Sequence, residues 1–134
     1  MVNYSPSARS SVIAVIVTLV LLLFIFTAPP LIMKNISAKV IPKTQATVEA
    51  LFREEWDTAI AEIDDVARLL EEREKTLMLF MDHHLVDELI TAAKGCQHLA
   101  RVHDRGQVFV ELEFILNRMH YLSESESFTL GNLL

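Results

Sequence analysis

Cysteine and glycine are scarce in this chain of 134 residues, which has one cysteine and three glycines. The single cysteine, Cys96, excludes a disulfide bond within the chain and leaves the redox state of its compartment undetermined. With so few glycines, the turns must be read from clusters of polar residues instead. The sequence also has no cysteine pair and no H-E-x-x-H motif. It therefore excludes disulfide scaffolds and the commonest zinc sites.

Charged side chains are missing from one long segment. No Asp, Glu, Lys or Arg occurs from Val12 to Met33, whereas the rest of the chain carries all 18 acidic residues and every basic residue. A run of about 20 apolar residues matches the roughly 30 Å hydrocarbon core of a bilayer. We therefore predict a transmembrane helix over residues 12–33, in contact with the lipid bilayer, after an N-terminal tail of residues 1–11.

An apolar segment near the N-terminus can also be a secretory signal peptide, which is removed from the mature protein. Here the apolar run exceeds the about 7–15 residues of a typical signal peptide, and no A-x-A motif follows it. Pro29 and Pro30 stand where a cleavage site would need small residues in extended conformation. The sequence therefore favours an uncleaved single-pass anchor in the cell membrane.

The basic residues near this segment bear on its orientation. Arg9 precedes it, and Lys34, Lys39 and Lys43 follow it. By the positive-inside rule these residues would keep the following domain in the cytoplasm. The rule is weakest for a single span with a short N-terminal tail and a downstream domain that can be translocated whole. Both orientations stay open on this count.

About 100 residues remain outside the span, which suffices for one small domain with one core. Their excess of acidic side chains repels phosphate backbones, so we expect no nucleic-acid partner. Proline breaks helices, and prolines stand at positions 29, 30 and 42. We therefore predict a kinked juxtamembrane linker over residues 34–43 and an α-helical soluble domain over residues 44–134.

Apolar residues at three- and four-residue spacing predict the helices of this domain. One stripe runs from Trp56 to Phe80, and a second runs from Leu85 to Ala100. The segment from Gln107 to Leu122 fits a strand or a helix, and we choose a helix because a lone strand would leave its backbone unpaired. The predicted fold class is all-α, with an N-terminal transmembrane helix and a bundle of three to four helices arranged as two hairpins.

A weak internal repeat agrees with two similar hairpins. The pattern AIAEIDDV at residues 59–66 recurs 49 residues later as VFVELEFI at residues 108–115, each after a short acidic turn. Repeated helix pairs produce such a period. Two copies of one amphipathic period can also arise by chance, so both explanations stay open.

The stretch LMLFMDHHLVDELI, residues 77–90, holds the residues with most chemical potential, which are Asp82, His83, His84, Asp87 and Glu88. On a helix, His83 and Asp87 lie one turn apart, and so do His84 and Glu88 on the adjacent face. Such pairs can bind a divalent metal or change charge near neutral pH. A metal-binding or pH-sensing domain centred on these residues is therefore one hypothesis.

A structural interpretation explains more of the same stretch. Asp82 follows an apolar run and precedes a new helical stripe, where its carboxylate can cap backbone N–H groups. Two adjacent histidines point about 100° apart on a helix, so His83 and His84 cannot readily bind one metal together. We therefore expect no metal site, no cofactor and no catalytic activity. Cys96 lies on the apolar stripe, which predicts a buried small hydrophobe rather than a reactive thiol.

Interaction is the function that the remaining features favour. The last helix is apolar on more than one side, and the C-terminus adds further apolar residues. Such surfaces are typical of contacts with a partner. The predicted interaction surface consists of Phe109, Val110, Phe114, Leu116, Phe128, Leu130, Leu133 and Leu134. We expect a membrane-anchored helical interaction module that docks a membrane protein or a second copy of itself.

The order of these features resembles a known family. The N-terminal span, Trp56, the stretch from Phe80 to Asp87 and the C-terminal Asn132-Leu133-Leu134 carry the resemblance, which covers nearly the whole chain. The chain is similar to an uncharacterised bacterial family of short single-pass membrane proteins, the domain of unknown function 4363 family. The resemblance implies an α-helical domain outside the cytoplasm and a multi-pass membrane protein as partner, and it carries no activity. Members tend to have an acidic residue where this chain has Leu85.

Overall fold

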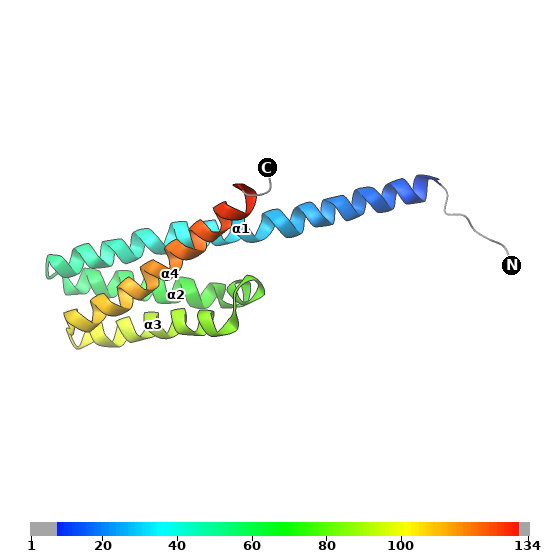
Figure 1. Ribbon diagram of the computed structural model, residues 1–134. Helices are drawn as coiled ribbons and strands as arrows, with labels where there is room; N and C mark the ends of the chain where they lie inside the picture. The colour runs from blue at the N-terminus through cyan, green and yellow to red at the C-terminus, as the bar shows by residue number, and fades with distance from the viewer. Residues whose placement is uncertain (1–7, 132–134) are drawn as a thin grey trace.

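Four α-helices make up the part of the chain that the computed structural model describes, which is residues 8–131, with side chains from 10 to 123 (Figure 1). They are α1 (Ala8–Phe52), α2 (Trp56–Phe80), α3 (His83–Arg101) and α4 (Arg105–Gly131). Within these residues no strand occurs. The predicted all-α fold is confirmed, and the segment that fitted either a strand or a helix lies in α4.

The second half of α1 and the three following helices form an antiparallel bundle (Figure 1). Each helix packs against the next one along the chain, and α4 returns to pack against α1. In the described part of the chain, α1 does not pack directly against α3, nor α2 against α4. The bundle is therefore a closed up-down-up-down arrangement of two hairpins, α1 with α2 and α3 with α4.

Helix α1 is longer than the sequence predicted. It continues without interruption through Pro29, Pro30 and Pro42. The linker predicted over residues 34–43 is therefore wrong, because these residues are helical and belong to the bundle. Among the described residues, α1 is the helix that is long and apolar enough to cross a membrane, and its first half holds the apolar stretch. By length and composition, this helix could be a membrane anchor or a signal sequence.

Burial explains why α1 persists through these prolines. Met33, Ile36 and Val40 lie three and four residues apart and are at most 3% exposed. Each buried side chain of this size contributes about 1.5–3 kcal/mol, which offsets the about 3 kcal/mol that a proline costs inside a helix. Pro42 has no backbone N–H to donate to the carbonyl of Ala38, four residues earlier. Both Pro42 and Ala38 are exposed. Water can therefore bind that carbonyl.

Three polar side chains of α1 also lie in the core. The hydroxyls of Thr44 and Thr47 each donate to the backbone carbonyl one turn earlier, at 2.9 Å. The Ser37 hydroxyl donates to the Met119 carbonyl of α4 at 3.3 Å. Each buried hydroxyl therefore has an acceptor, and Ser37 links α1 to α4.

The core is one apolar cluster to which all four helices contribute. Cys96 belongs to it and is 1% exposed. Burial, with a smaller effect of the Glu111 carboxylate, raises the pKa of the Cys96 thiol to about 12. The thiol is therefore protonated at neutral pH, as expected of a small buried hydrophobe. The core residues of α2, α3 and α4 include Ala59, Ile63, Val66, Leu70, Leu77, Val86, Leu89, Ala93, Ala100, Val108, Leu112, Ile115 and Met119.

The turns at residues 53–55 and 102–104 have the same backbone geometry. Their central residues, Glu54 and His103, are in the left-handed region, with φ of 60° and 57°. The N–H of each central residue donates to the carbonyl three positions earlier, and the next N–H donates to the carbonyl five positions earlier at 2.9 Å. This pattern is the Schellman motif of helix C-termini. The turns are 49 residues apart, the period of the sequence repeat, so the two hairpins share turn geometry as well as helix pattern.

Replacing Glu54 with glycine should stabilise the bundle by about 0.5–1 kcal/mol, because glycine adopts a left-handed conformation without a Cβ clash. The change also removes the carboxylate that lies 3.6 Å from Arg105. Glu54→Ala is the matched control, since it loses the same carboxylate and keeps a Cβ. Urea unfolding followed by circular dichroism measures both variants. A glycine variant no more stable than the alanine variant would show that this turn is not strained.

Candidate interaction surfaces

The histidine and acid cluster lies at the turn between α2 and α3. Helix α2 ends at Phe80 and α3 begins at His83, with Asp82 as its N-cap. The Asp82 Oδ1 accepts a hydrogen bond from the backbone N–H of His84 at 2.8 Å. This bond satisfies one of the donors left free at a helix start. The predicted capping role of Asp82 is confirmed.

The other side chains of this cluster do not converge on one point. His83, His84 and Asp87 are exposed. The Nε2 of His84 lies 3.8 Å from Glu88 Oε1, and the guanidinium of Arg118 lies 3.8 Å from Glu88 Oε2. Among the residues that the structure describes, no three His, Cys, Asp or Glu side chains are placed to hold a metal ion. The geometry thus supplies no ligand set for the metal-binding hypothesis.

An open groove of about 360 Å³ lies between α3 and α4. The guanidinium of Arg118 covers one lining ring, that of Phe114, at 5.2 Å from its centroid. The groove is open to solvent rather than enclosed, unlike most small-molecule sites. Its lining residues are His84, Asp87, Glu88, Thr91, Ala92, Glu111 and Phe114.

The sequence predicts a spare apolar face on α4, and the structure reduces it. Phe109 and Phe114 are half-buried against the core, and Leu116 is half-buried in a groove beside α1. Val110 is 60% exposed. The physical reason is that α4 has neighbours on two sides, α1 and α3, so its apolar arc serves two helix contacts. Of the other predicted residues, the side chains of Phe128 and Leu130 lie outside the described part of the chain. Leu133 and Leu134 lie outside it entirely.

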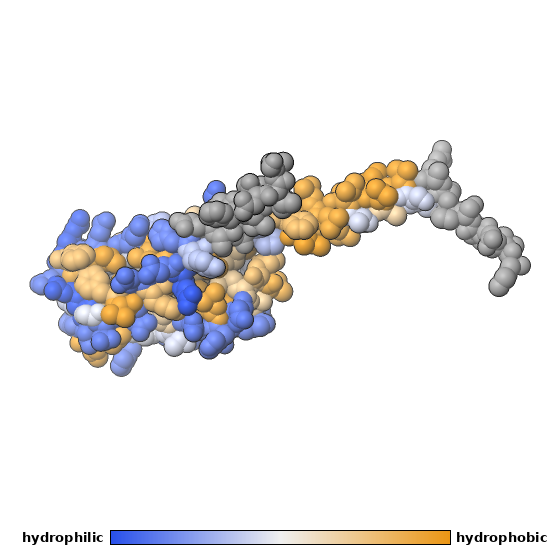
Figure 2. All heavy atoms as spheres, in the orientation of Figure 1, coloured by the Kyte–Doolittle hydropathy of each residue, from blue (hydrophilic) through white to orange (hydrophobic). Residues whose placement is uncertain are grey.

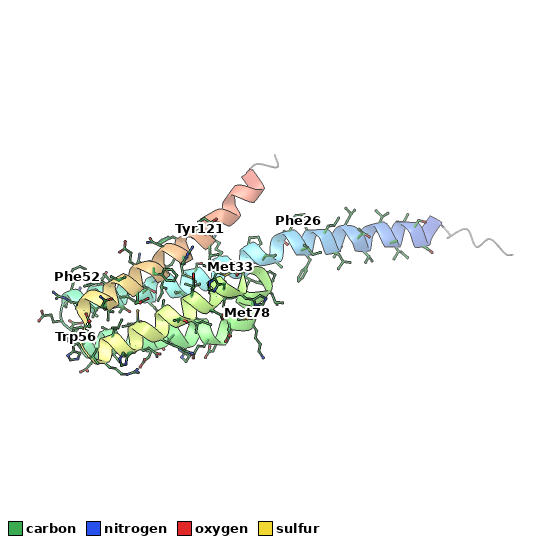
Figure 3. The ribbon with its side chains drawn as sticks, turned by 60° about the horizontal axis from the view of Figure 1, so that its bottom comes forward. Phe26, Met33, Phe52, Trp56, Met78 and Tyr121 are labelled. Atoms are coloured by element: carbon green, nitrogen blue, oxygen red, sulfur yellow. The ribbon has the colours of Figure 1, made fainter. Side chains whose placement is uncertain are left out.

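The groove between α1 and α4 has a volume of about 390 Å³ and collects several apolar side chains. Phe52 is 71% exposed, although its ring packs on Phe109 with 5.1 Å between centroids. Tyr121 is 64% exposed and lies nearer the other end of the bundle than Phe52 (Figure 3). The sequence analysis described no apolar stripe before Trp56 and therefore did not find this face of α1. We define the α1/α4 surface as Val48, Phe52, Phe109 and Leu116, which line this groove, together with Val110 and Tyr121 on the solvent-facing side of α4.

Exposed apolar side chains also gather where α1 leaves the bundle. Leu79 is 77% exposed, Phe80 is 40% exposed, and Leu31 is 71% exposed. Figure 3 shows Met33 and Met78 at this end of the bundle, and Figure 2 shows hydrophobic atoms here and along the free part of α1. The sequence placed Phe80 on the buried stripe of α2, which is wrong, because Phe80 is 40% exposed and Leu77 is the last fully buried residue of this helix.

Ion pairs join α1 to α2. The Lys43 ammonium donates to Asp65 at 2.6 Å and to Glu62 at 3.3 Å, and Arg68 donates to Asp65 at 2.9 Å. The hydrogen bond from Lys43, followed by that from Arg68, lowers the pKa of Asp65. The hydrogen bond to Asp65 in turn raises the pKa of Lys43. These carboxylates hold a basic residue that the sequence analysis assigned to a linker.

Lys43→Met should reduce the dependence of bundle stability on pH in acid. The folded-state pKa of Asp65 is below its ordinary value of 3.8. Its pairing therefore stabilises the bundle above that pH and is lost as the pH falls through the folded-state pKa. Thermal unfolding between about pH 2 and 5 measures the slope.

Lys94→Met is the matched control for this change, because Lys94 pairs with Glu71 of α2 at 3.0 Å without any contact to Asp65. The Lys94 variant should keep the slope of the unmodified protein. An unchanged slope in the Lys43 variant would mean that the Lys43–Asp65 pair does not carry this pH dependence.

A comparison with protein-family models finds a match that covers most of the chain. The model described as Domain of unknown function (DUF4363) matches residues 32–133. No curated protein and no solved structure matches the chain. The match begins one residue before Met33, the first buried residue of α1. It therefore covers the bundle and not the apolar segment before it.

Proposed function

The chain belongs to the DUF4363 family, a domain of unknown function, and we propose that it is a membrane-anchored helical interaction module without catalytic activity. The observation that carries this proposal is the continuity of α1. Its first half is apolar and exposed, and its second half is the first helix of the bundle. A bilayer is the environment that covers such a segment, because lipid satisfies the apolar side chains and a helix pairs its own backbone.

Continuity of α1 also restricts how the bundle moves. A flexible linker would let a soluble domain swing away from its anchor, whereas α1 has no loop between its apolar half and Phe52. In this proposal, α1 holds the bundle at a fixed distance from the bilayer surface. Its side faces are therefore presented to other proteins in the same membrane.

The α1/α4 surface is the contact face that this proposal assigns to a membrane-protein partner. It contains two aromatic side chains that are mostly exposed, Phe52 and Tyr121, and the apolar Val110. Aromatic residues are enriched at protein interfaces and contribute strongly there. A second copy of the chain is the other occupant that the same face could take, and the experiment below separates the two.

Phe52→Glu combined with Val110→Glu should lower recovery of the partner in cross-linked pull-downs from native membranes by about tenfold or more, because interface aromatic residues contribute about 2 kcal/mol. Both side chains are mostly exposed, so the bundle should stay folded by circular dichroism. Val102→Glu is the matched control, since Val102 is 61% exposed and lies outside this surface.

The pull-down result decides between the occupants. A cross-linked dimer of this chain that is lost with the double substitution means that the partner is a second copy. Unchanged recovery of every cross-linked protein would remove the α1/α4 surface as the interface.

A location of the bundle on the outer side of the membrane is part of the same proposal, and the family resemblance supports it. By the positive-inside rule, Lys43 counts toward a cytoplasmic bundle. It lies within the bundle, however, and is paired with Asp65 and Glu62. With the bundle on the outer side, protease added to intact protoplasts should digest it. Protection until the membrane is opened would place it inside. An intact mass of 15.2 kDa would establish that the anchor is not cleaved.

A further inference from the structure

The register between α1 and α2 fixes the height of the turn between α2 and α3. Lys43 on α1 contacts Glu62 and Asp65 on α2, and antiparallel helices have the same rise per residue. Counting about 15 residues from this contact toward the turn reaches Ala28 on α1 and Leu79 on α2. These two residues therefore lie at about the same height, and Figure 1 shows the turn beside the point where α1 leaves the bundle.

The burial of α1 agrees with this register. Residues 10–27 are exposed, whereas residues 28–30 are half-buried. The change occurs where the end of α2 arrives beside α1. The end of the bundle thus reaches residues that belong to the uncharged segment of α1, which extends to Met33.

The position of a bilayer around α1 follows from the length of the uncharged segment. About 20 helical residues cross the hydrocarbon core, so a core that begins at Val12 ends near Leu31. The headgroup layer adds about 5–7 Å on that side, which is about four further residues of helix. Ala28 lies just inside this boundary. The turn at the same height therefore lies at the border between hydrocarbon and headgroups.

The side chains at this turn suit such a border. Leu77 is the last fully buried residue of α2, yet the next four residues are also apolar, and of these Met78 and Met81 pack against the core. In the last turn of α2, Leu79 is 77% exposed and Phe80 is 40% exposed. Leu31, on α1 at the same end, is 71% exposed. The apolar surface of the free half of α1 therefore continues onto the end of the bundle.

We infer that the α2–α3 turn is a second membrane contact, in which Leu79 and Phe80 enter the bilayer border beside α1. The inference rests on the proposed anchoring of α1 in a bilayer. Lipid is the occupant because the turn is level with the segment that lipid surrounds, and because the apolar surfaces of both are continuous. Two contacts, α1 and the turn, then fix the tilt of the bundle and the direction in which the α1/α4 surface faces.

Quenching of tryptophan by brominated lipid tests this contact in the full-length protein. The only native tryptophan, Trp56, is replaced by phenylalanine, and Leu79→Trp is added. The protein is placed in phosphatidylcholine vesicles with bromine atoms near the headgroup end of the acyl chains. We expect brominated lipid to remove about half of the emission, because the side chain lies within the border region.

Val102→Trp in the same Trp56→Phe background is the matched control. Val102 is also an exposed apolar turn residue, 61% exposed, but it lies at the opposite end of the bundle. The two turns are separated by α3, which has 19 residues, or about 28 Å of helix. The Val102→Trp emission should respond to acrylamide in the water and not to brominated lipid. Circular dichroism equal to that of the unmodified protein shows that each variant is folded.

Each result of this experiment has one meaning. Quenching of Leu79→Trp by brominated lipid supports the contact. Quenching by acrylamide alone places the turn in water, and protection from both quenchers means that protein covers it, so either result overturns the inference. Flotation with the vesicles is measured first. A protein that does not float would refute the anchoring of α1 and this inference together, whereas floating protein without lipid quenching would refute the inference alone.

Discussion

Val40→Asp should unfold the bundle, whereas Ala38→Asp should leave it folded. Val40 is 0% exposed in the core, and Ala38 is exposed two residues earlier on the same helix. A buried carboxylate without a partner costs about 4 kcal/mol or more. A domain of this size has about 5–15 kcal/mol of stability in total. The Val40 variant should therefore lose most of its helical signal well below the unfolding temperature of the control.

This pair of variants separates two accounts of the same residues. A linker over residues 34–43 would tolerate an aspartate at either position, because neither side chain would be buried. A bundle helix tolerates it only at Ala38. Thermal unfolding by circular dichroism, together with resistance to a low concentration of protease, measures the difference. Equal stability of the two variants would remove residues 34–43 from the core.

Leu21→Arg combined with Leu22→Arg should release the protein from the membrane. Both side chains lie in the middle of the apolar half of α1 and are exposed. An arginine at the centre of a span costs about 2.5–3.5 kcal/mol, and the leucine that it replaces contributes about −0.5 kcal/mol. The double change therefore disfavours insertion by about 6–8 kcal/mol. We expect the protein to appear in the supernatant after carbonate washing of membranes.

Leu21→Ala combined with Leu22→Ala is the control for this change. It removes the same leucine side chains without adding charge, and the segment stays uncharged from Val12 to Met33. The alanine variant should remain in the membrane. Retention of the arginine variant would mean that another part of the chain, or a partner, holds the protein there.

The amphipathic helices were the part of the fold that the sequence predicted well. The stripe from Trp56 to Phe80 corresponds to α2, and the stripe from Leu85 to Ala100 lies within α3. These predictions succeeded because each helix has one buried and one charged face, so the spacing of apolar residues reports the helix directly. Asp82 was predictable as a cap for a similar local reason, since its hydrogen bond reaches only two residues along the chain.

Helix α1 was mispredicted because a local rule was overridden by packing. Pro42 argued for a break, but Val40 and Ile36 are buried at helical spacing. The contacts that bury them come from α2 and α4, which are distant in sequence. Propensity is a weak prior in such cases, since tertiary contacts outweigh the cost of one proline. Applying the three- and four-residue spacing of apolar residues across the prolines would have found this buried stripe.

The candidate surfaces show a similar limit. On a single helix, Phe109 and Phe114 lie off the main apolar stripe and were predicted to contact a partner. In the bundle, α4 packs against both α1 and α3, and the two rings are half-buried. Phe80 looked buried on the stripe of α2, but it is 40% exposed and follows Leu77, the last fully buried residue of this helix. Periodicity gives the direction of a side chain around its helix. It does not give the number of neighbouring helices or the height at which the core ends.

The central claim is that one rigid helix joins the apolar segment to the bundle. The most direct test is the distance between spin labels on Leu19→Cys and Gln45→Cys in bilayer discs, measured by pulsed electron resonance. Both positions are exposed on α1, and Cys96 is buried and protonated, so it should not react. A continuous helix predicts one narrow distribution near 39 Å, from 26 residues at about 1.5 Å each. A broad distribution, or a mean well below this distance, would contradict the claim.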